Sequence, residues 1–371
     1  MQSLRLSLIC GPRQRVDLGE SAAHAWHSFV EDALLADELG YDSFMAGEHH
    51  FTFASGNSSP YLLLAEVAAR TEQIRIGTSV ACLPFHNPLR VAEDIAALDI
   101  VSKGRFDFGV GVGSQWEEFN TFGINPKEKF GRTWEAIDLI DRCLHGGEET
   151  FSHEGKYFNF PDIRWIIPPV QDRVPFFWGG FGPQGVTRAA ERDFELLSWD
   201  FSGAYERTLA THNRRIEDHL VGFVHQVSIG RTRKDAWEAV GPASTWMNNV
   251  YATRRGLDGV LPDPEEVSIT VDDLYDDLHS GQQPKSLFPP IFGTVDEVTE
   301  QFLAQVRGQT PLGFANNICI EAHTPGMERD DVRRTITLFA KEIMPVLRDE
   351  ARKVRAERSQ RYATEAQPVS L

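Results

Sequence analysis

The stretch "LRVAEDIAALDIVSKGRFDFGVGVG" (Leu89–Gly113) contains the pattern that decides the fold. Its first half places apolar side chains at helical spacing, which predicts an amphipathic helix over residues 89–102. Its second half is a short apolar run over residues 105–113, which is typical of a buried strand. The stretch therefore predicts one helix followed by one strand of an α/β protein.

The same alternation continues in both directions along the chain. Strands are expected at residues 4–10, 41–47, 74–82, 105–113, 174–180, 194–199, 222–230 and 314–323. Helices are expected at residues 25–40, 61–71, 89–102, 132–146, 185–193, 205–220, 232–246 and 329–347. Strict alternation requires parallel strands with helical crossovers. Eight such pairs predict an α/β fold of the (β/α)8 TIM-barrel type, with residues 1–347 as a single domain.

Three segments interrupt this rhythm. Thr150–Val170 alternates polar and apolar residues and contains three prolines, which predicts an inserted hairpin. Residues 258–290 lack clear periodicity and are expected to form a mobile loop that closes over a ligand as a lid. After Leu347 the apolar stripe is lost, so residues 348–371 are expected to be a charged tail, a fraying helix followed by disorder.

The bulk composition excludes several classes of partner. The 371 residues include 37 basic and 54 acidic side chains, a net charge of −17. An acidic surface disfavours nucleic acids and anionic membranes. The four cysteines form no CxxC pair and are expected to be reduced core thiols. The sequence shows no signal peptide and no membrane-spanning run, so a cytoplasmic protein is expected.

The active site of a (β/α)8 barrel lies at the carboxyl ends of its strands. The second expected strand ends in Glu48, His49 and His50. A histidine at that place can donate or accept a proton near neutral pH. The alternative is that one or both histidines only hydrogen-bond to neighbouring loops. Adjacent histidines differ from the usual pair of metal ligands on one helix face, so no metal site is predicted.

Two glycine-rich segments follow other strands. "GVGVGS" (Gly109–Ser114) lacks the last glycine of a dinucleotide fingerprint, so Gly111 and Gly113 are interpreted either as room for a flat ligand or as a tight turn. "WGGFGPQG" (Trp178–Gly185) precedes a helix and is either a phosphate site or a simple turn. Trp199 is either a core residue or a stacking partner for a ligand. The nearby Asp107, Glu117 and Glu118 are interpreted as solvent-exposed charges.

Several motifs taken together resemble those of the bacterial-luciferase-like flavin monooxygenases. They are "GEHHFT" (residues 47–52), the segment Asn87–Gly113, "LLSW" (residues 196–199), and "PLGFANNICIEAH" with "LFAKEIMPVL" near the C-terminus. The resemblance covers nearly the whole chain and implies a βα barrel that uses reduced FMN and O2, or in one branch a deazaflavin. It implies that His49 is catalytic, and Glu48 is expected to be catalytic with it. It also implies a non-proline cis peptide bond at Ser79-Val80 under the flavin ring.

The resemblance further implies a flavin site and a substrate pocket. The residues expected at the flavin are Ser79, Val80, Gly111, Gly113, Gly179, Gly180, Phe181, Gly182 and Trp199. The pocket is expected to include His50, Phe51, Phe53, Phe85, Trp116 and also Phe181, and to accept an apolar or aromatic organic molecule. The sequence departs from luciferase at Val112, which replaces a phosphate-binding arginine, at Gly111, which replaces a cysteine, and at Gly180, Phe181 and Gln184. Backbone N–H groups of residues 180–185, or another arginine, would have to hold the phosphate.

These observations predict a two-component, flavin-dependent monooxygenase. A separate flavin reductase would supply reduced FMN, and the substrate would be an aldehyde, a ketone or a similar small molecule. Relatives pair through early helices, which implies a homodimer. One alternative is a deazaflavin-dependent hydride-transfer enzyme on the same barrel. A second is a non-catalytic flavin-binding protein, against which the intact Glu48-His49-His50 signature argues.

Overall fold

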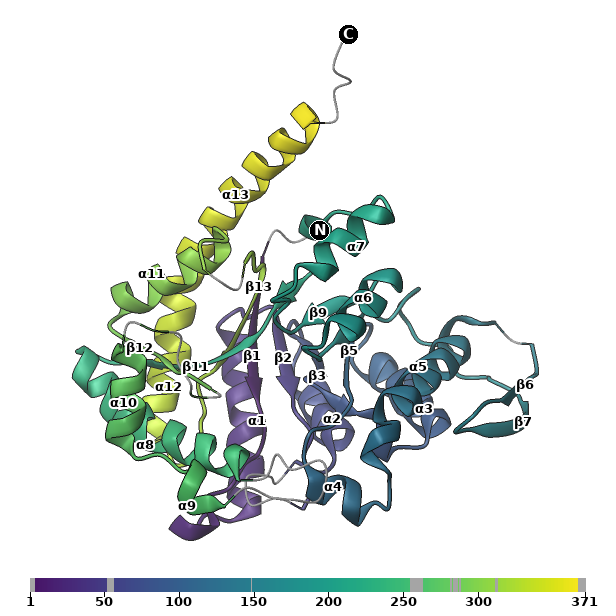
Figure 1. Cartoon of the computed structure of the whole chain (residues 1–371), viewed down its shortest axis with the longest axis horizontal. Helices are drawn as coiled ribbons and strands as arrows, with labels where there is room; N and C mark the ends of the chain where they lie inside the picture. The colour runs from purple at the N-terminus through teal and green to yellow at the C-terminus, as the bar shows by residue number, and fades with distance from the viewer. Residues whose placement is uncertain are drawn as a thin grey trace.

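The computed structural model describes residues 4–51, 57–147, 149–253, 263–280, 282, 286, 288–310 and 313–365, with residues 361–365 described by backbone alone. Its centre is a curled sheet of parallel strands surrounded by helices (Figure 1). The strands that form the ring are β1 (Arg5–Cys10), β2 (Ser43–Ala46), β3 (Arg75–Thr78), β5 (Phe106–Gly111), β8 (Phe176–Trp178), β9 (Glu195–Leu197), β10 (Val221–Gly222) with β11 (Val224–Ile229), and β13 (Asn317–Glu321).

The sheet closes through one interrupted strand. Neighbouring strands pair in the order β9, β8, β5, β3, β2, β1, β13 and β11. β10 pairs in parallel with β9, and β11, which starts two residues after β10 ends, pairs in parallel with β13. The segment Val221–Ile229 therefore joins the two ends of the sheet. This arrangement confirms the predicted α/β fold with eight parallel strand segments of a luciferase-like TIM barrel.

Helices cover the outer face of this sheet. Those that follow the ring strands are α1 (Ala22–Glu38), α2 (Pro60–Arg70), α3 (Pro88–Val101), α5 (Lys129–His145), α6 (Pro183–Glu191), α7 (Ala204–Thr211), α8 (Arg233–Ala252) and α12 (Arg329–Leu338), which continues through a π-helical turn (Phe339–Ile343) into α13 (Met344–Glu365). Short 3-10 helices lie at Val16–Leu18, Leu83–Phe85, Pro126–Glu128 and Ile216–Asp218. Side chains cap several helix starts: Asn87 accepts hydrogen bonds from the N–H groups of Leu89 and Arg90.

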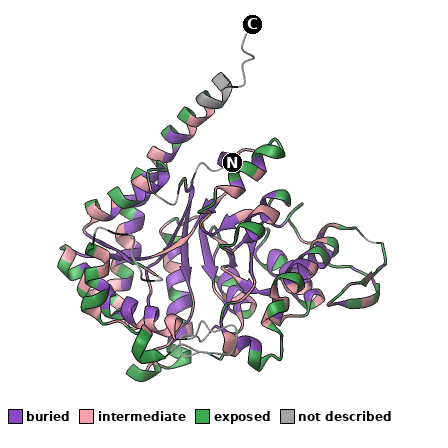
Figure 2. Cartoon of the chain, in the orientation of Figure 1, coloured by how far each residue is buried: buried purple, intermediate pink, exposed green. Residues whose placement is uncertain are grey.

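The core lies between the sheet and these helices. In Figure 2 the strands of the central sheet are buried along most of their length, whereas the helices are buried on one side only. Leu6, Leu8, Phe44 and Phe108 are fully buried. Strands that are covered on one face by helices and on the other by the barrel interior need apolar residues on both faces. That requirement explains why the strands read as near-continuous apolar runs.

The sequence-based interpretation of Asp107 as an exposed charge is wrong. Its side chain is buried, and it accepts hydrogen bonds from Arg5 Nη1 at 2.7 Å and Arg75 Nη2 at 2.6 Å. A buried carboxylate needs such partners because desolvation without them costs several kcal/mol. Asp107 therefore belongs to the barrel core.

The expected structureless loop at residues 258–290 is also wrong in part. Its described residues include α9 (Pro264–Val267) and α10 (Val271–His279), and α10 starts with a capping box between Thr270 and Asp273. Val271, Leu274, Tyr275 and Leu278 recur at helical spacing after the Thr270 cap, so the sequence does indicate this short helix and the interpretation of the segment as aperiodic was mistaken. The lid function of this segment stays a prediction.

The structure also contains elements that the predicted alternation of strands and helices did not include. The strand–helix pair β12 (Ile291–Gly293) and α11 (Val295–Val306) follows the inserted segment, and β12 pairs with β11. β4 (Ala81–Cys82) pairs with β5, and α4 (Trp116–Thr121) follows β5. The predicted hairpin is confirmed as β6 (Phe151–Glu154) and β7 (Asn159–Ile163), which pair antiparallel and project from the body (Figure 1).

The chain end differs from the expected fraying tail over its described part. α13 extends away from the body in Figure 1, but its first turns bury Ala351 and Val354. Arg358 forms ion pairs with Glu206 and Glu217 of the barrel. The predicted boundary at residue 347 stays a prediction, and residues 366–371 lie outside the described part. Among the helices described, none is long and apolar enough to cross a membrane.

Candidate active site

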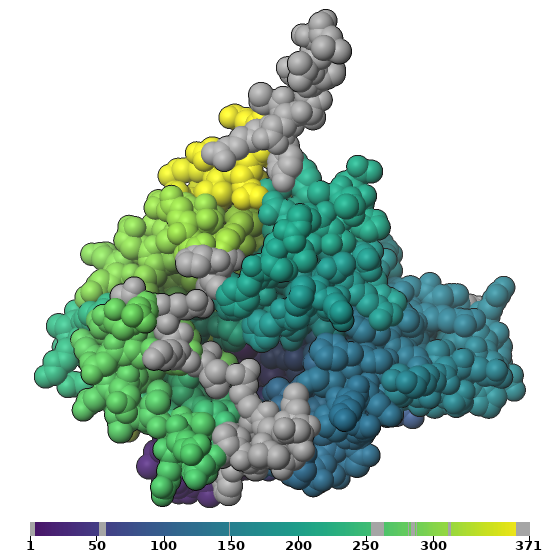
Figure 3. All heavy atoms as spheres, viewed as in Figure 1, coloured from purple at the N-terminus to yellow at the C-terminus, as the bar shows by residue number. Residues whose placement is uncertain are grey.

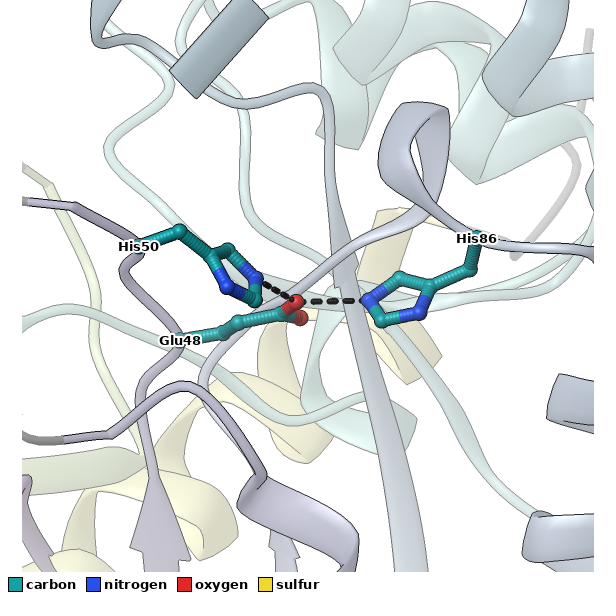
Figure 4. A group of neighbouring side chains, drawn as sticks. All are labelled: Glu48, His50 and His86. Carbon is teal, nitrogen blue, oxygen red and sulfur yellow. Dashed lines mark hydrogen bonds and ion pairs between the residues drawn. The ribbon is translucent and has the colours of Figure 1, made fainter. Parts of the chain in front are cut away.

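Glu48 lies at the carboxyl end of β2, between two imidazole rings. Its Oε1 atom is 2.6 Å from His50 Nε2 and 2.5 Å from His86 Nε2 (Figure 4). Its Oε2 atom accepts the backbone N–H of Cys82 at 2.7 Å. Cys82 lies in the short strand before the 3-10 helix Leu83–Phe85 and His86 follows that helix, so the segments after β2 and after β3 converge on one carboxylate. Glu48 is therefore a positioning group for the two rings.

Hydrogen bonds to Glu48 lower its pKa by more than burial raises it. Burial alone would raise the pKa of this carboxyl, but the bonds from His50, His86 and the Cys82 N–H lower the pKa from 4.5 to about 2. Burial conversely lowers the pKa of His86, yet the bond to Glu48 and its negative charge raise it overall. Glu48 is thus an anion at neutral pH, and its charge favours a proton on His86.

Glu48, His50 and His86 also have the chemistry of a metal site. Their ligand-type atoms lie within 4.8 Å of one another. However, ligands that sit about 2.0–2.1 Å from one zinc ion in a tetrahedral site lie more than 3 Å apart, whereas the two closest contacts here are 2.5 and 2.6 Å. Those separations are typical of charge-assisted hydrogen bonds. The geometry fits a hydrogen-bonded triad better than a metal centre.

His49 points to the other side of the same segment and is held at both ring nitrogens. Its Nδ1 atom is 3.3 Å from Glu118 Oε1, and its Nε2 atom is 2.6 Å from the hydroxyl of Tyr251. Glu118 also accepts the backbone N–H of His50 at 2.8 Å. Glu118 is fully buried, so its interpretation as an exposed charge is wrong. Its Oε1 atom contacts both histidines.

A buried ion pair lies beside Tyr251. Arg13, which follows β1, pairs with Glu321 at the carboxyl end of β13. Burial would lower the pKa of Arg13, but the charge of Glu321 raises it overall. Burial and the charges of Glu321 and Glu118 raise the pKa of Tyr251 to about 12, although Arg13 opposes this. Tyr251 is therefore a neutral phenol at any physiological pH.

The expected pocket residues are brought together only in part. His50 is buried, and its ring packs edge-on against Phe122 with centroids 4.9 Å apart. Phe122 also contacts Phe51 at 5.2 Å and stacks on Phe85 at 5.0 Å. Phe51 is 60% exposed, and Trp116 is half-buried at the start of α4. Phe53 lies outside the described residues.

The segment expected under a flavin ring has an unusual backbone. The Ser79-Val80 peptide bond is cis, as the resemblance implied. A Cβ atom on Gly111 would lie 2.4 Å from Val80 Cγ2, and one on Gly179 would lie 2.4 Å from Val80 Cγ1. The two glycines therefore make room for the Val80 side chain. Gly113 has a φ of +72°, which fits the tight-turn interpretation. That Ser79, Val80 and these glycines bind a cofactor stays a prediction.

We expect Gly179→Ala to lower the free energy of unfolding by about 1–3 kcal/mol, because the added methyl group overlaps Val80. In a Val80→Ala background the same substitution should cost less, because the overlapping Cγ1 atom is absent. Urea unfolding of the four variants of this cycle measures both costs. Equal costs in the two backgrounds would show that Val80 does not require the glycine.

The fifth and sixth strands of the ring contribute the remaining expected residues. Phe181 is 51% exposed and its ring lies 5.4 Å from Phe223, which is 5.3 Å from Trp199. Ser198 donates a hydrogen bond to the carbonyl of Gly180 at 2.9 Å. Phe223, in the break between β10 and β11, thus links the two predicted flavin contacts. Figure 3 shows that the face viewed there is hollowed near its centre, where atoms of the N-terminal part of the chain are visible between later segments.

The turn before α6 offers hydrogen-bond donors. Gly182 is the N-cap of α6, and no side chain caps this helix. The Trp178 ring lies beneath the turn, since Cβ atoms on Gly180 and Gly185 would meet it at 2.8 Å. Trp178 is 1% exposed, and its indole Nε1 has no hydrogen-bond partner in the described part of the chain. A buried donor beside free helix N–H groups suits an anionic group such as a phosphate.

His86 and Tyr251 were missed by the sequence analysis, and Arg13 was not considered. His86 precedes the "NPLRV" segment and carries no periodic signal of its own. Tyr251 is 202 residues from His49 in the chain, and no local pattern could connect the two. The strand-end rule applies to Arg13, which lies just beyond β1, and could have identified it.

Comparison with known proteins gives a consistent result. The family model for luciferase-like monooxygenase matches residues 4–308. An alkanal monooxygenase alpha chain from Photobacterium leiognathi is 26% identical over 71% of this chain and 75% of its own. With several other curated relatives, the matched stretch spans about half of their length or less.

Two solved structures share the fold. The oxygenating constituent of the 3,6-diketocamphane monooxygenase from Pseudomonas putida, in complex with FMN, has a TM-score of 0.70 at 22% identity and covers 92% of this chain and 98% of its own. An F420-dependent secondary alcohol dehydrogenase with an F420-acetone adduct has a TM-score of 0.71 at 19% identity, with 94% and 99% covered. At these identities the likeness concerns the fold alone.

Proposed function

The chain belongs to the luciferase-like monooxygenase family, and from this membership we propose that it is a two-component flavin-dependent monooxygenase. It would receive reduced FMN from a separate reductase and use O2 to oxygenate a small organic substrate. The observation that carries the proposal is the pair of groups at the end of β2: an anionic Glu48 that orients His50 and His86, and His49 beside it at the barrel mouth.

The residues present fit FMN in two respects. The uncapped N-terminus of α6 and the unpartnered Trp178 indole N–H offer donors for a phosphate where luciferase uses side chains. Val80, with Gly111 and Gly179 packed against its methyl groups, offers a flat apolar surface for a ring system. Phe181 and Trp199 would line the edge of the same site. When bound, reduced FMN supplies the two electrons that activate O2.

The side chains of this site would bind and orient the substrate, and they would exclude water. Glu48 holds the His50 ring against Phe122 and Phe85, so the aromatic cluster has a fixed wall on one side. That wall would restrict the entry of water, which protects a reactive intermediate. His49 would exchange a proton with the substrate, the role that a histidine imidazole most often has in acid–base catalysis. The aromatic composition favours an apolar substrate, such as an aldehyde or a ketone.

The deazaflavin alternative rests on one specific observation. The F420-bound dehydrogenase shares this fold as closely as the FMN-bound monooxygenase does. The absence of an arginine at position 112 does not distinguish the two cofactors, because both carry phosphate. A non-catalytic flavin carrier would not need the buried Glu48 triad, whose desolvation has to be offset by its hydrogen bonds. Pairing into a homodimer stays a prediction.

We expect the purified protein to bind photoreduced FMN with a Kd in the micromolar range or below. On mixing with O2 in the presence of a medium-chain aldehyde or a cyclic ketone, we expect product formation together with oxidation of the flavin. Anaerobic absorbance titration measures binding, and mass spectrometry with 18O2 measures oxygen incorporation. Incorporation of one labelled atom per product molecule is the result expected of a monooxygenase.

The same titration with reduced F420 separates the alternatives. Tight binding of F420 without binding of reduced FMN would overturn the proposal in favour of a hydride-transfer enzyme. Binding of reduced FMN that is followed by oxidation without any labelled product, over a panel of aldehydes, ketones and terpenes, would favour the carrier interpretation. A Trp178→Phe variant removes the indole N–H and should weaken FMN binding more than riboflavin binding if that donor faces the phosphate.

A further inference from the structure

The two partners of the His49 ring determine where its proton resides. Glu118 is a carboxylate whose Oε1 atom already accepts the His50 N–H at 2.8 Å, and the same atom lies 3.3 Å from His49 Nδ1. A carboxylate oxygen can only accept, so Nδ1 must carry a hydrogen. A neutral imidazole has one N–H group, and Nε2 is therefore an acceptor. The group 2.6 Å from Nε2 is the Tyr251 hydroxyl, which donates.

We infer that Tyr251 is a positioning residue that, together with Glu118, fixes neutral His49 as the Nδ1–H tautomer and leaves Nε2 as its basic nitrogen. The catalytic meaning of this inference rests on the proposed function, but the tautomer itself does not. Proton exchange by His49 then takes place at Nε2, on the side of the ring that faces α8, and not at Nδ1. Glu118 connects this ring to the neighbouring Glu48 triad, because the same Oε1 atom accepts the backbone N–H of His50.

The surroundings keep Tyr251 in the donating state. Glu118 and Glu321 place negative charge near its hydroxyl, which opposes ionisation, whereas Arg13 favours it. The pKa of Tyr251 is about 12, so the phenol keeps its proton. Its ring is edge-on to His49 with centroids 5.5 Å apart, and edge-on to Phe288 at 4.8 Å. Tyr251 thus stands between His49 and the segment that returns from the insertion.

Two residues of α8, Tyr251 and Asn248, also contact the end of the inserted segment. Tyr251 lies in the last turn of α8, and Phe288 lies at the end of the inserted segment. Asn248, one turn earlier in α8, accepts the backbone N–H of Phe288 at 3.2 Å. The contacts of Tyr251 therefore connect the His49 ring to the end of the inserted segment.

The test uses nitrogen NMR of the full chain labelled with 15N-histidine and recorded without flavin. Long-range proton–nitrogen spectra distinguish a protonated ring nitrogen from an unprotonated one, and His49→Asn identifies the resonances. In the parent protein we expect the pattern of a protonated Nδ1 and an unprotonated, hydrogen-bonded Nε2. In Tyr251→Phe we expect the Nε2 shift to move away from its hydrogen-bonded value and the two tautomers to mix. Tyr275→Phe, in the exposed half of α10, is the matched control and should leave both shifts unchanged.

Two results would overturn the inference. One is a parent protein in which Nε2 carries the proton; the other is a Tyr251→Phe protein that is folded by circular dichroism and retains both His49 shifts. If Tyr251→Phe does not fold, Glu118→Gln gives the second reading, because an amide can donate to Nδ1 and should raise the Nε2–H population. These spectra need no cofactor. A protein that fails to oxygenate any substrate but shows the expected tautomer would refute the proposed function and leave this inference intact.

Discussion

His49→Asn is expected to lower the rate of coupled oxygenation by about 10²–10⁴-fold, the usual contribution of a positioned acid–base group. Asparagine is similar in size to histidine and can still hydrogen-bond to Tyr251 or Glu118, so the barrel mouth keeps its shape. An amide cannot exchange a proton near neutral pH, so the proton transfer step loses its group. The measurement is product formed per reduced FMN oxidised, with reduced FMN binding followed by absorbance in parallel.

In His49→Asn we expect the binding of reduced FMN to persist while coupled oxygenation is lost. We expect reduced FMN to bind within a few-fold of the parent protein, because the residues proposed to hold the flavin lie at Val80 and the α6 turn. His27→Asn is the matched control: His27 is exposed on α1 and is not among the residues proposed for the site, so the same change there should leave turnover unaltered. Parent-like coupling in His49→Asn would remove His49 from the proposed mechanism, and equal loss in both variants would indicate a general effect on folding.

The barrel was predictable because its signals are local. Each strand–helix pair of the ring appears as a short apolar run followed by an amphipathic one, and the alternation alone requires parallel strands. β12 was missed because it spans only three residues, too few to show an alternation. It forms because it pairs with β11, which is information that no local window contains. α10 was missed for a different reason: its apolar residues lie at helical spacing, but the surrounding prolines, glycines and aspartates led to its interpretation as a loop.

The site was predictable only where one rule applied. Strand ends in a parallel barrel converge, which identified Glu48 and His49 as candidates. Glu118 was misinterpreted because acidic residues are mostly exposed, and the two histidine contacts that pull it inside lie 68 and 69 residues away in the chain. His86 and Tyr251 were missed for the same reason, because each lies far along the chain from the residue that it contacts. The cis bond at Ser79-Val80 came from the family resemblance, since nothing in the residue pair itself indicates it.

Glu48→Gln is expected to lower the free energy of unfolding by about 3 kcal/mol at pH 7. The carboxyl has a pKa of about 2 in the folded protein against an ordinary value of 4.5. Each tenfold change in proton affinity is worth about 1.4 kcal/mol, which gives the stated size. Because the folded pKa is the lower one, this stability is fully present above pH 4.5 and is lost as pH falls from there toward 2. Glutamine carries no charge at any pH, so the variant lacks this component throughout.

The variant should therefore differ from the parent protein in the shape of its acid unfolding as well as in its stability. Urea unfolding at pH 7 and at several values down to pH 3 should show the gap between the two proteins narrowing with acidity, because the parent protein loses the charge that the variant never had. Glu72→Gln, at an exposed position after α2, is the matched control and should run parallel to the parent at every pH. A gap that stays constant from pH 7 to pH 3 would mean that packing of the side chain, and not its charge between His50 and His86, stabilises this end of β2.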